Sequence, residues 1–238
     1  MCLILVAWQL HARFPLVVAA NRDEFYARPS APAGPWPDHP EVLGGLDLEA
    51  GGTWLGVGPK GRFAAVTNVR EPGVPKGVRS RGELPRRFLV GEAPPAAYAQ
   101  GLDGSLYSGF NLLAADDEAL WYRSNRDGAA RPLGPGLYGL SNHLLDTPWP
   151  KLVTAKARMA GALEALPAFT ELFALLADRE LVPDASLPAS GVSLEWERLL
   201  SAIFVQSPTY GTRASTVLTV DRQGTPVLEE RLFGPPDR

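Results

Sequence analysis

Short apolar runs that come in pairs, each pair joined by a turn, constrain this chain of 238 residues more than any other feature. The apolar run Leu3–Gln9 is followed by a turn at His11–Pro15 and by a second run at Leu16–Ala20. A pair of this kind predicts a β-hairpin, because apolar runs bounded by turn residues are typical of buried strands. The pattern returns three times, at Thr53–Val57 with Phe63–Asn68, Phe110–Ala115 with Ala119–Arg123, and Ser215–Val220 with Val227–Phe233.

A few segments have helical spacing instead. Ser80, with Glu83 three residues later, has the pattern of a capping box and predicts a helix through Phe88. Further helices are expected at Trp149–Leu166, at Phe169–Leu176, and at Leu194–Phe204 with Ser193 as its cap, whereas the proline-rich stretch 29–40 is expected to be loop. Hairpins with segregated helices indicate an α+β fold with helices layered on antiparallel sheet. Without a repeat or linker, residues 1–238 are expected to form a single domain.

Composition excludes some classes of function. The formal net charge of -3 argues against a nucleic-acid binder, which needs excess basic residues to neutralise phosphates. A single cysteine cannot form an internal disulfide, and the apolar start is too short to span a membrane and lacks the basic region of a signal peptide. We therefore expect a cytoplasmic protein without a membrane span. The excess of arginine over lysine is typical of a GC-rich bacterial source.

The one cysteine, Cys2, is the second residue of the chain. If Met1 is removed, the α-amine of Cys2 can accept the proton of its own thiol, the role that a histidine plays in other cysteine enzymes. The alternative is a buried, inert cysteine at the start of a strand. Position alone does not decide between the two.

Four polar residues, Asn21–Glu24, follow the apolar part of the second strand. A solvated turn is the simpler interpretation. However, a hairpin that leaves Cys2 and returns at Asn21–Glu24 brings Asp23 near the start of the chain, where its carboxylate can hold the α-ammonium group.

Several other residues are candidates for the same site. Asn68 ends a predicted strand and Asn142 lies in a Gly-Leu-Ser-Asn segment, and each side-chain amide can donate to an oxyanion or serve as a turn residue. Arg213 stands among small residues, where either a buried partner or a surface ion pair explains it. Trp54 can line a pocket or fill the core.

Metal chemistry is not expected. His11, His39 and His143 are the three histidines, and none is spaced for a metal site. His143 is a candidate base or haem ligand, although a single histidine is more often neither.

The sequence resembles the NRDE-motif family, also called the transport-and-Golgi-organisation family. The resemblance covers nearly the whole chain and rests on these motifs in this order: Met-Cys at 1–2, Asn-Arg-Asp-Glu at 21–24, Gly-Gly-Thr-Trp-Leu-Gly at 51–56, Thr-Asn at 67–68, Gly-Leu-Ser-Asn at 139–142, Pro-Trp-Pro-Lys at 148–151 and Tyr-Gly-Thr-Arg-Ala-Ser-Thr at 210–216. That family is distantly similar to the cholylglycine hydrolase and penicillin V acylase group, so the resemblance implies an N-terminal-nucleophile hydrolase-like αββα sandwich.

The resemblance also implies roles for individual residues. Cys2 matches the nucleophile, Asp23 the aspartate near the α-amine, and Arg213 the late arginine near the nucleophile. Asn68 and Asn142 match the two asparagines around the oxyanion, and we assign Asn21, Arg22 and Trp54 to the substrate pocket.

One departure from the hydrolase pattern is visible. Ala20 stands where those hydrolases carry an arginine, and Arg22 falls on a neighbouring position that we expect to face the opposite side of the strand.

Two functions are consistent with these residues. The first is a cysteine amidohydrolase, without a cofactor, that cleaves a non-peptide C–N bond of a small acyl amide. The alternative is a haem- or lipid-handling protein on the same scaffold with a vestigial site, because the family resemblance carries a link to haem trafficking and lipid metabolism. Non-covalent haem b would then be held by His143, His11 or Cys2, since imidazole and thiolate are haem ligands.

Overall fold

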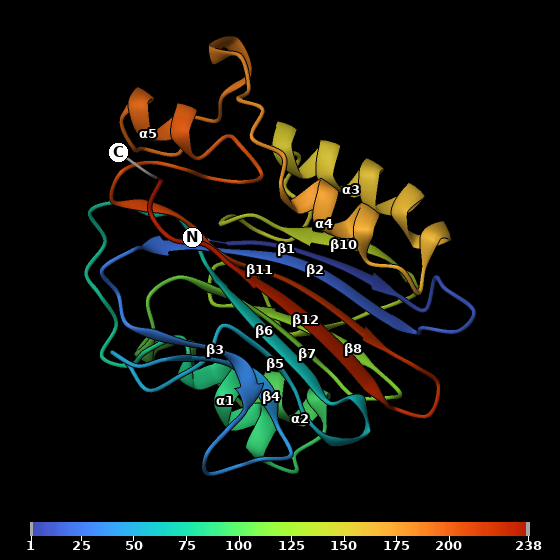
Figure 1. Cartoon of the computed structure of the whole chain (residues 1–238). Helices are drawn as coiled ribbons and strands as arrows, with labels where there is room; N and C mark the ends of the chain where they lie inside the picture. The colour runs from blue at the N-terminus through green and yellow to red at the C-terminus, as the bar shows by residue number, and fades with distance from the viewer. Residues whose placement is uncertain (1, 237–238) are drawn as a thin grey trace.

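Two antiparallel β-sheets lie face to face, with helices on both outer sides, in the computed structural model, which describes residues 2–236 (Figure 1). This is the expected αββα sandwich. Alternating apolar residues produce it, because each strand has one face toward the other sheet and one face toward helices.

The first sheet has the strand order β10-β1-β2-β11-β12, and all its pairs are antiparallel. β2 is the central strand and is buried along nearly its whole length. The strands are β1 (Cys2–Trp8), β2 (Leu16–Phe25), β10 (Gly136–Leu140), β11 (Tyr210–Val220) and β12 (Pro226–Leu232).

The second sheet is a meander that follows chain order from β3 to β9. Its strands are β3 (Ser30–Pro35), β4 (Leu43–Asp47), β5 (Leu55–Val57), β6 (Phe63–Asn68), β7 (Phe110–Ala115), β8 (Leu120–Ser124) and β9 (Arg131–Leu133).

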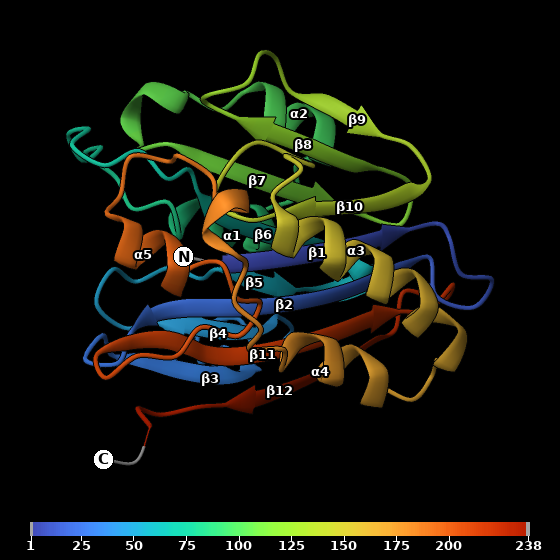
Figure 2. The ribbon, with the colours of Figure 1, turned by 90° about the horizontal axis from the view of Figure 1, so that it is seen from above.

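Helices α3 (Pro150–Ala162) and α4 (Thr170–Leu176) cover the outer face of the first sheet (Figure 2). Helices α1 (Glu83–Val90) and α2 (Pro95–Gln100) cover the second, and α5 (Leu194–Leu199) precedes β11. Short 3-10 turns lie at Pro59–Gly61, Gly104–Leu106, Leu163–Ala165 and Asp184–Ser186. In the part of the chain that the structure describes, no helix has the length and apolar character needed to cross a bilayer.

Residue parity along β1 and β2 sorts the side chains into two cores. Even-numbered residues such as Ile4 and Val18 pack between the sheets against Phe63 of β6. Odd-numbered residues such as Leu3 and Val17 pack under the helices. Each fully buried aliphatic side chain contributes about 1.5–3 kcal/mol, so both faces of β2 are held firmly in register.

The structure changes four local predictions. β2 does not end at Ala20 but continues through Asn21–Glu24, so this motif is strand and not turn. The proline-rich stretch contains β3, which tolerates proline because it is the edge strand of its sheet.

The prediction that Ser80 caps helix α1 is wrong. Helix α1 is capped by Gly82 without a side-chain bond, and the Glu83 carboxylate pairs with Arg79. The Ser193 cap is confirmed, since its hydroxyl accepts a hydrogen bond from the Trp196 amide, although α5 ends at Leu199 and not at Phe204.

Candidate active site

Cys2 begins β1 and lies directly opposite Arg22 of β2. The residue is half-buried. Its backbone N–H donates a hydrogen bond to Oδ1 of Asn142 over 3.2 Å. One end of the sandwich therefore brings together residues that are 140 positions apart in the chain.

Asn142 links the two sheets at this point. It follows β10, which pairs with β1, and its Nδ2 donates to the backbone oxygen of Asn68 at the end of β6, over 3.2 Å. Its backbone has a φ of 62°, in the left-handed region that asparagine tolerates better than most residues. Its own carbonyl accepts from the Arg70 amide at 2.7 Å, so the turn is held on both sides. The structure thus brings together Cys2, Asn68 and Asn142, three of the five residues that the sequence analysis proposed as catalytic.

Asp23 faces the helix side of the first sheet, where it is 2% exposed. Its Oδ1 accepts a hydrogen bond from the Thr212 hydroxyl at 2.7 Å, and its backbone oxygen accepts from the Tyr210 hydroxyl at 3.1 Å. Burial raises the pKa of the Asp23 carboxyl, and the positive charge of Lys151 acts in the opposite direction. The carboxylate is therefore buried on the strand that pairs with β1, under the helix layer.

Asn21 lies on the same helix side and is fully engaged there. Its Nδ2 donates to the carbonyls of Leu176 and Ile203 at 2.8 and 2.9 Å, and its Oδ1 accepts from the Ser215 hydroxyl at 2.6 Å. We expected Asn21 in a substrate pocket, but in the structure its side chain links β2 to the helix layer through hydrogen bonds.

Arg22 lies on the opposite face, between the sheets, with its guanidinium 4.2 Å from the ring centroid of Trp54. Because Ala20 and Arg22 are two residues apart, they share this face of β2, and the expectation that Arg22 faces away from the position of Ala20 is wrong. The positive charge that Ala20 lacks is thus present two residues further along the same face of β2, opposite Cys2.

The environment of the thiol favours its neutral form. Burial raises the pKa of Cys2, and the Asp23 charge raises it further, whereas Arg22 and a backbone hydrogen bond from Asp23 lower it. A proton acceptor is therefore needed before the sulfur can attack a carbonyl.

Lys151 is a site residue that sequence reasoning missed. It lies in the first turn of α3 and is 6% exposed, and its Nζ donates to the carbonyls of Leu200 and Ala202 at 2.7 and 3.4 Å. Burial lowers the pKa of Lys151 to about 8, while the nearby Asp23 charge raises it. The only signal in the sequence was its place in the Pro-Trp-Pro-Lys motif.

Arg81 was also missed. It lies in the loop before α1, donates to the carbonyl of Gly109 at 3.2 Å, and has its pKa lowered by burial while the charges of Glu71 and Cys2 act against that shift. A second guanidinium is thus electrostatically coupled to the thiol.

Arg213 and His143 make contacts away from the thiol. Arg213 lies at a β-bulge in β11, and its Nη1 donates to the carbonyls of Phe25 and Arg28, both at 3.0 Å. His143 is exposed, with Nδ1 2.8 Å from the Thr147 hydroxyl and its ring 5.6 Å from that of Trp149. The roles expected for both residues stay predictions.

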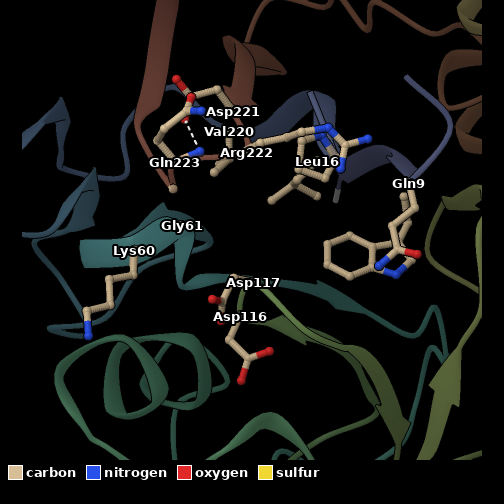
Figure 3. Close-up of a pocket in the computed structure, with 13 residues that line it drawn as sticks. Gln9, Leu16, Lys60, Gly61, Asp116, Asp117, Val220, Asp221, Arg222 and Gln223 are labelled. Carbon is tan, nitrogen blue, oxygen red and sulfur yellow. Dashed lines mark hydrogen bonds between the residues drawn. The ribbon is translucent and has the colours of Figure 1, made fainter. Parts of the chain in front are cut away.

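A large cavity of about 620 Å³ lies at the other end of the sandwich (Figure 3). Three turns surround it, those that carry Lys60, Asp116 and Asp221, and β1 contributes Trp8. Since β1 runs from Cys2 to Trp8, a strand of seven residues separates this cavity from the thiol by about 20 Å. The cavity is therefore separate from the candidate active site.

Comparison with known proteins identifies relatives along almost the entire chain. The family model described as "Transport and Golgi organisation 2" matches residues 1–235. A Transport and Golgi organization protein 2 homolog from Bos taurus is 42% identical, with 92% of this chain and 86% of that protein covered. The Homo sapiens homolog is 40% identical over the same shares. These animal relatives do not support the bacterial source expected from composition.

A search of solved structures finds the same fold in a Caenorhabditis elegans protein, an ortholog of N-acylethanolamine-hydrolyzing acid amidase. The TM-score is 0.56, and 93% of each chain is covered at 15% identity. At this identity the likeness establishes the shared fold alone.

Proposed function

The chain belongs to the Transport and Golgi organisation 2 family, and from that premise we propose that it is a cysteine N-terminal-nucleophile amidohydrolase. Its substrate class is a small acyl amide, cleaved at a non-peptide C–N bond. The observation that carries the proposal is the link from the Cys2 nitrogen to Asn142 and on to Asn68, with Asp23 buried on the adjacent strand. The structural neighbour, an ortholog of an amidase that hydrolyses N-acylethanolamines, adds support because an N-acylethanolamine is an acyl amide.

The proposed reaction begins with removal of Met1, which converts the Cys2 amide nitrogen into an α-amine. An α-amine has a pKa of about 7.7–8.0 and accepts the thiol proton, and Sγ then attacks the substrate carbonyl. The oxyanion is stabilised by the Asn68 amide, whose backbone is fixed by Asn142. The C–N bond breaks as the amine returns the proton to the leaving nitrogen, and water hydrolyses the thioester to release the acid and restore the thiol.

The test compares three proteins against a panel of N-acyl aminocoumarins whose acyl groups are either neutral or carry a carboxylate. Intact mass first establishes that Met1 is absent from the native protein. We expect the Cys2→Ala variant, and a chain with an N-terminal extension that blocks the Cys2 amine, both to lose activity by at least about 10³-fold. Full activity in either protein rejects the proposal.

Haem or lipid handling remains the second candidate, carried by the family resemblance. The candidate ligands do not converge on one haem: His11 binds the amides of Arg13 and Phe14 in the β1–β2 turn, at the end of the hairpin away from Cys2. His143, beside Thr147, and Cys2 would remain. Hemin titration of wild type and His143→Ala is the test, and a Soret shift that the variant abolishes would favour this candidate.

A further inference from the structure

Arg22 is a buried guanidinium whose charge the described residues leave without a hydrogen-bonded partner. It is 6% exposed and stacks on the Trp54 ring. Across residues 2–236 its guanidinium makes no hydrogen bond or ion pair to a protein acceptor, unlike Arg28, which is paired with Asp47 and Glu49. A buried charge of this kind is costly unless an opposite charge or acceptor meets it.

Glu230, whose charge interacts with that of Arg22, and Glu24, two residues along β2, make their hydrogen bonds to other groups. Glu230 accepts from the Thr216 hydroxyl at 3.0 Å and from the Ala33 amide at 2.7 Å, and Glu24 accepts from the Phe25 amide at 2.9 Å. Asp23 is on the other face of β2, bound to Thr212. None of these carboxylates makes a hydrogen bond to Arg22, so its N–H groups are open to an acceptor from outside the protein.

The indole of Trp54 covers one face of the guanidinium, so the N–H edges are the part left for a ligand. Those edges suit the two oxygens of a carboxylate or a phosphate, which arginine binds as a fork. Arg22 lies directly across from Cys2, and Arg81 adds a second positive charge that interacts with the thiol.

We propose that Arg22 binds an oxyanionic group of the substrate, a carboxylate or phosphate carried close to the bond that Cys2 attacks. The anion site follows from Arg22 and Trp54 alone; that its ligand is an acyl amide rests on the proposed function. Neutral acyl amides are then poor substrates, and anionic ones are selected.

The test measures how fast Cys2, the one thiol of the chain, is alkylated by iodoacetate and by iodoacetamide at one pH. The two reagents differ in a carboxylate against a neutral amide, and their rate ratio cancels the fraction of thiolate. We expect a ratio at least about 10-fold above that of free cysteine in wild type, and a fall to the free-cysteine value in Arg22→Gln. The matched control is Arg231→Gln. Arg231 lies in β12 of the same sheet as Arg22, and its guanidinium also stacks on an aromatic ring, that of Phe173 in α4.

An unchanged ratio in Arg22→Gln overturns the inference, and a slower reaction with both reagents assigns Arg22 to thiolate stabilisation instead. If the thiol reacts with neither reagent, calorimetry on Cys2→Ala decides with N-acetylglycine against its neutral amide. Equal affinity for the two, or a preference that survives Arg22→Gln, also overturns it.

Failure of the proposed function looks different. If the alkylation ratio depends on Arg22 but the protein has no amidase activity, the anion site stands and the proposed function is rejected. If the protein is an active amidase but its alkylation ratio is unchanged in Arg22→Gln, the proposed function stands and the anion site is rejected.

Discussion

At the scale of single residues, Asn142 holds the candidate site together through both its backbone and its side chain. Its φ of 62° aims the side chain so that Oδ1 meets the Cys2 nitrogen while Nδ2 meets the Asn68 carbonyl. A left-handed conformation costs an ordinary residue about 1–2 kcal/mol, and glycine almost nothing.

Substituting Asn142 by glycine and by alanine separates these two contributions. Asn142→Gly loses only the side-chain bonds, and we expect it to lower the free energy of unfolding by about 1–3 kcal/mol. Asn142→Ala should lose about 1 kcal/mol more because it adds backbone strain. Urea unfolding measures both, and equal stability of the two variants would show that the backbone strain is absent.

Lys151 gives the stability a dependence on pH. Its pKa in the folded protein is about 8, below the ordinary 10.5, so the unfolded chain binds more protons between these values and stability rises with pH there. Below pH 8 the full cost of the buried charge is present.

Lys151→Met removes this dependence. From pH 7 to pH 9.5 the wild type should gain about 2 kcal/mol relative to the variant, as follows from a pKa lowered to about 8. Denaturant unfolding at several pH values measures the gain, with the exposed Lys76→Met as the control. Parallel curves for wild type and Lys151→Met would contradict the shift.

At the scale of elements, β2 positions most of the polar residues of the candidate site. It is paired on both sides, with β1 and with β11. The polar residues at its end also contact the helix layer on one face and the second sheet on the other. The Asn21 amide makes three hydrogen bonds there, to Leu176, Ile203 and Ser215.

Asn21→Leu should therefore be among the more damaging substitutions in the sheet. It leaves two buried carbonyls without donors, and we expect a loss of about 2–5 kcal/mol in the free energy of unfolding. Glu229→Gln, on exposed β12, is the control and should change stability by less than about 0.5 kcal/mol. A loss below 1 kcal/mol for Asn21→Leu would show that the interaction with the helix layer is weak.

Sequence patterns predicted these elements unevenly. The hairpin strands were predictable because apolar runs and turns are local signals, and β6 and β7 begin and end where expected. β10 was missed, since Gly136–Leu140 is short and glycine-rich and pairs with β1, more than 100 residues away. Cys2, Asp23, Asn68 and Asn142 were candidates from their places at the chain start, at strand ends and in a predicted turn, and the family motifs added the roles expected of them. That Arg22 has no hydrogen-bonded partner among the described residues, and that Lys151 is buried, could not be predicted in this way. Both depend on packing between segments that are distant in the sequence.

At the scale of the whole molecule, β1 and β2 take part in both cores, so the layers are expected to unfold together. Phe63 packs between the sheets and Met159 of α3 packs under the helices, and both are 0% exposed. A shared pair of strands couples these two regions directly.

Truncating each side chain tests this coupling. Phe63→Ala should cost about 3–5 kcal/mol and Met159→Ala about 2–5 kcal/mol. If residues 1–238 form one domain, as predicted, both variants shift one thermal transition that remains single in calorimetry. Two separated transitions, each moved by only one variant, would mean that the layers unfold independently.

The central position of β2 also sets how its motif can change in evolution. Asn21 and Asp23 face one compartment and Arg22 faces the other, so a single inserted or deleted residue would exchange the contents of both. The acid would enter the space beside the thiol and the arginine would enter the helix layer. Substitutions at these positions remove one contact at a time, but a change in length reverses them all, and the spacing of the motif is for this reason harder to alter than any one of its letters.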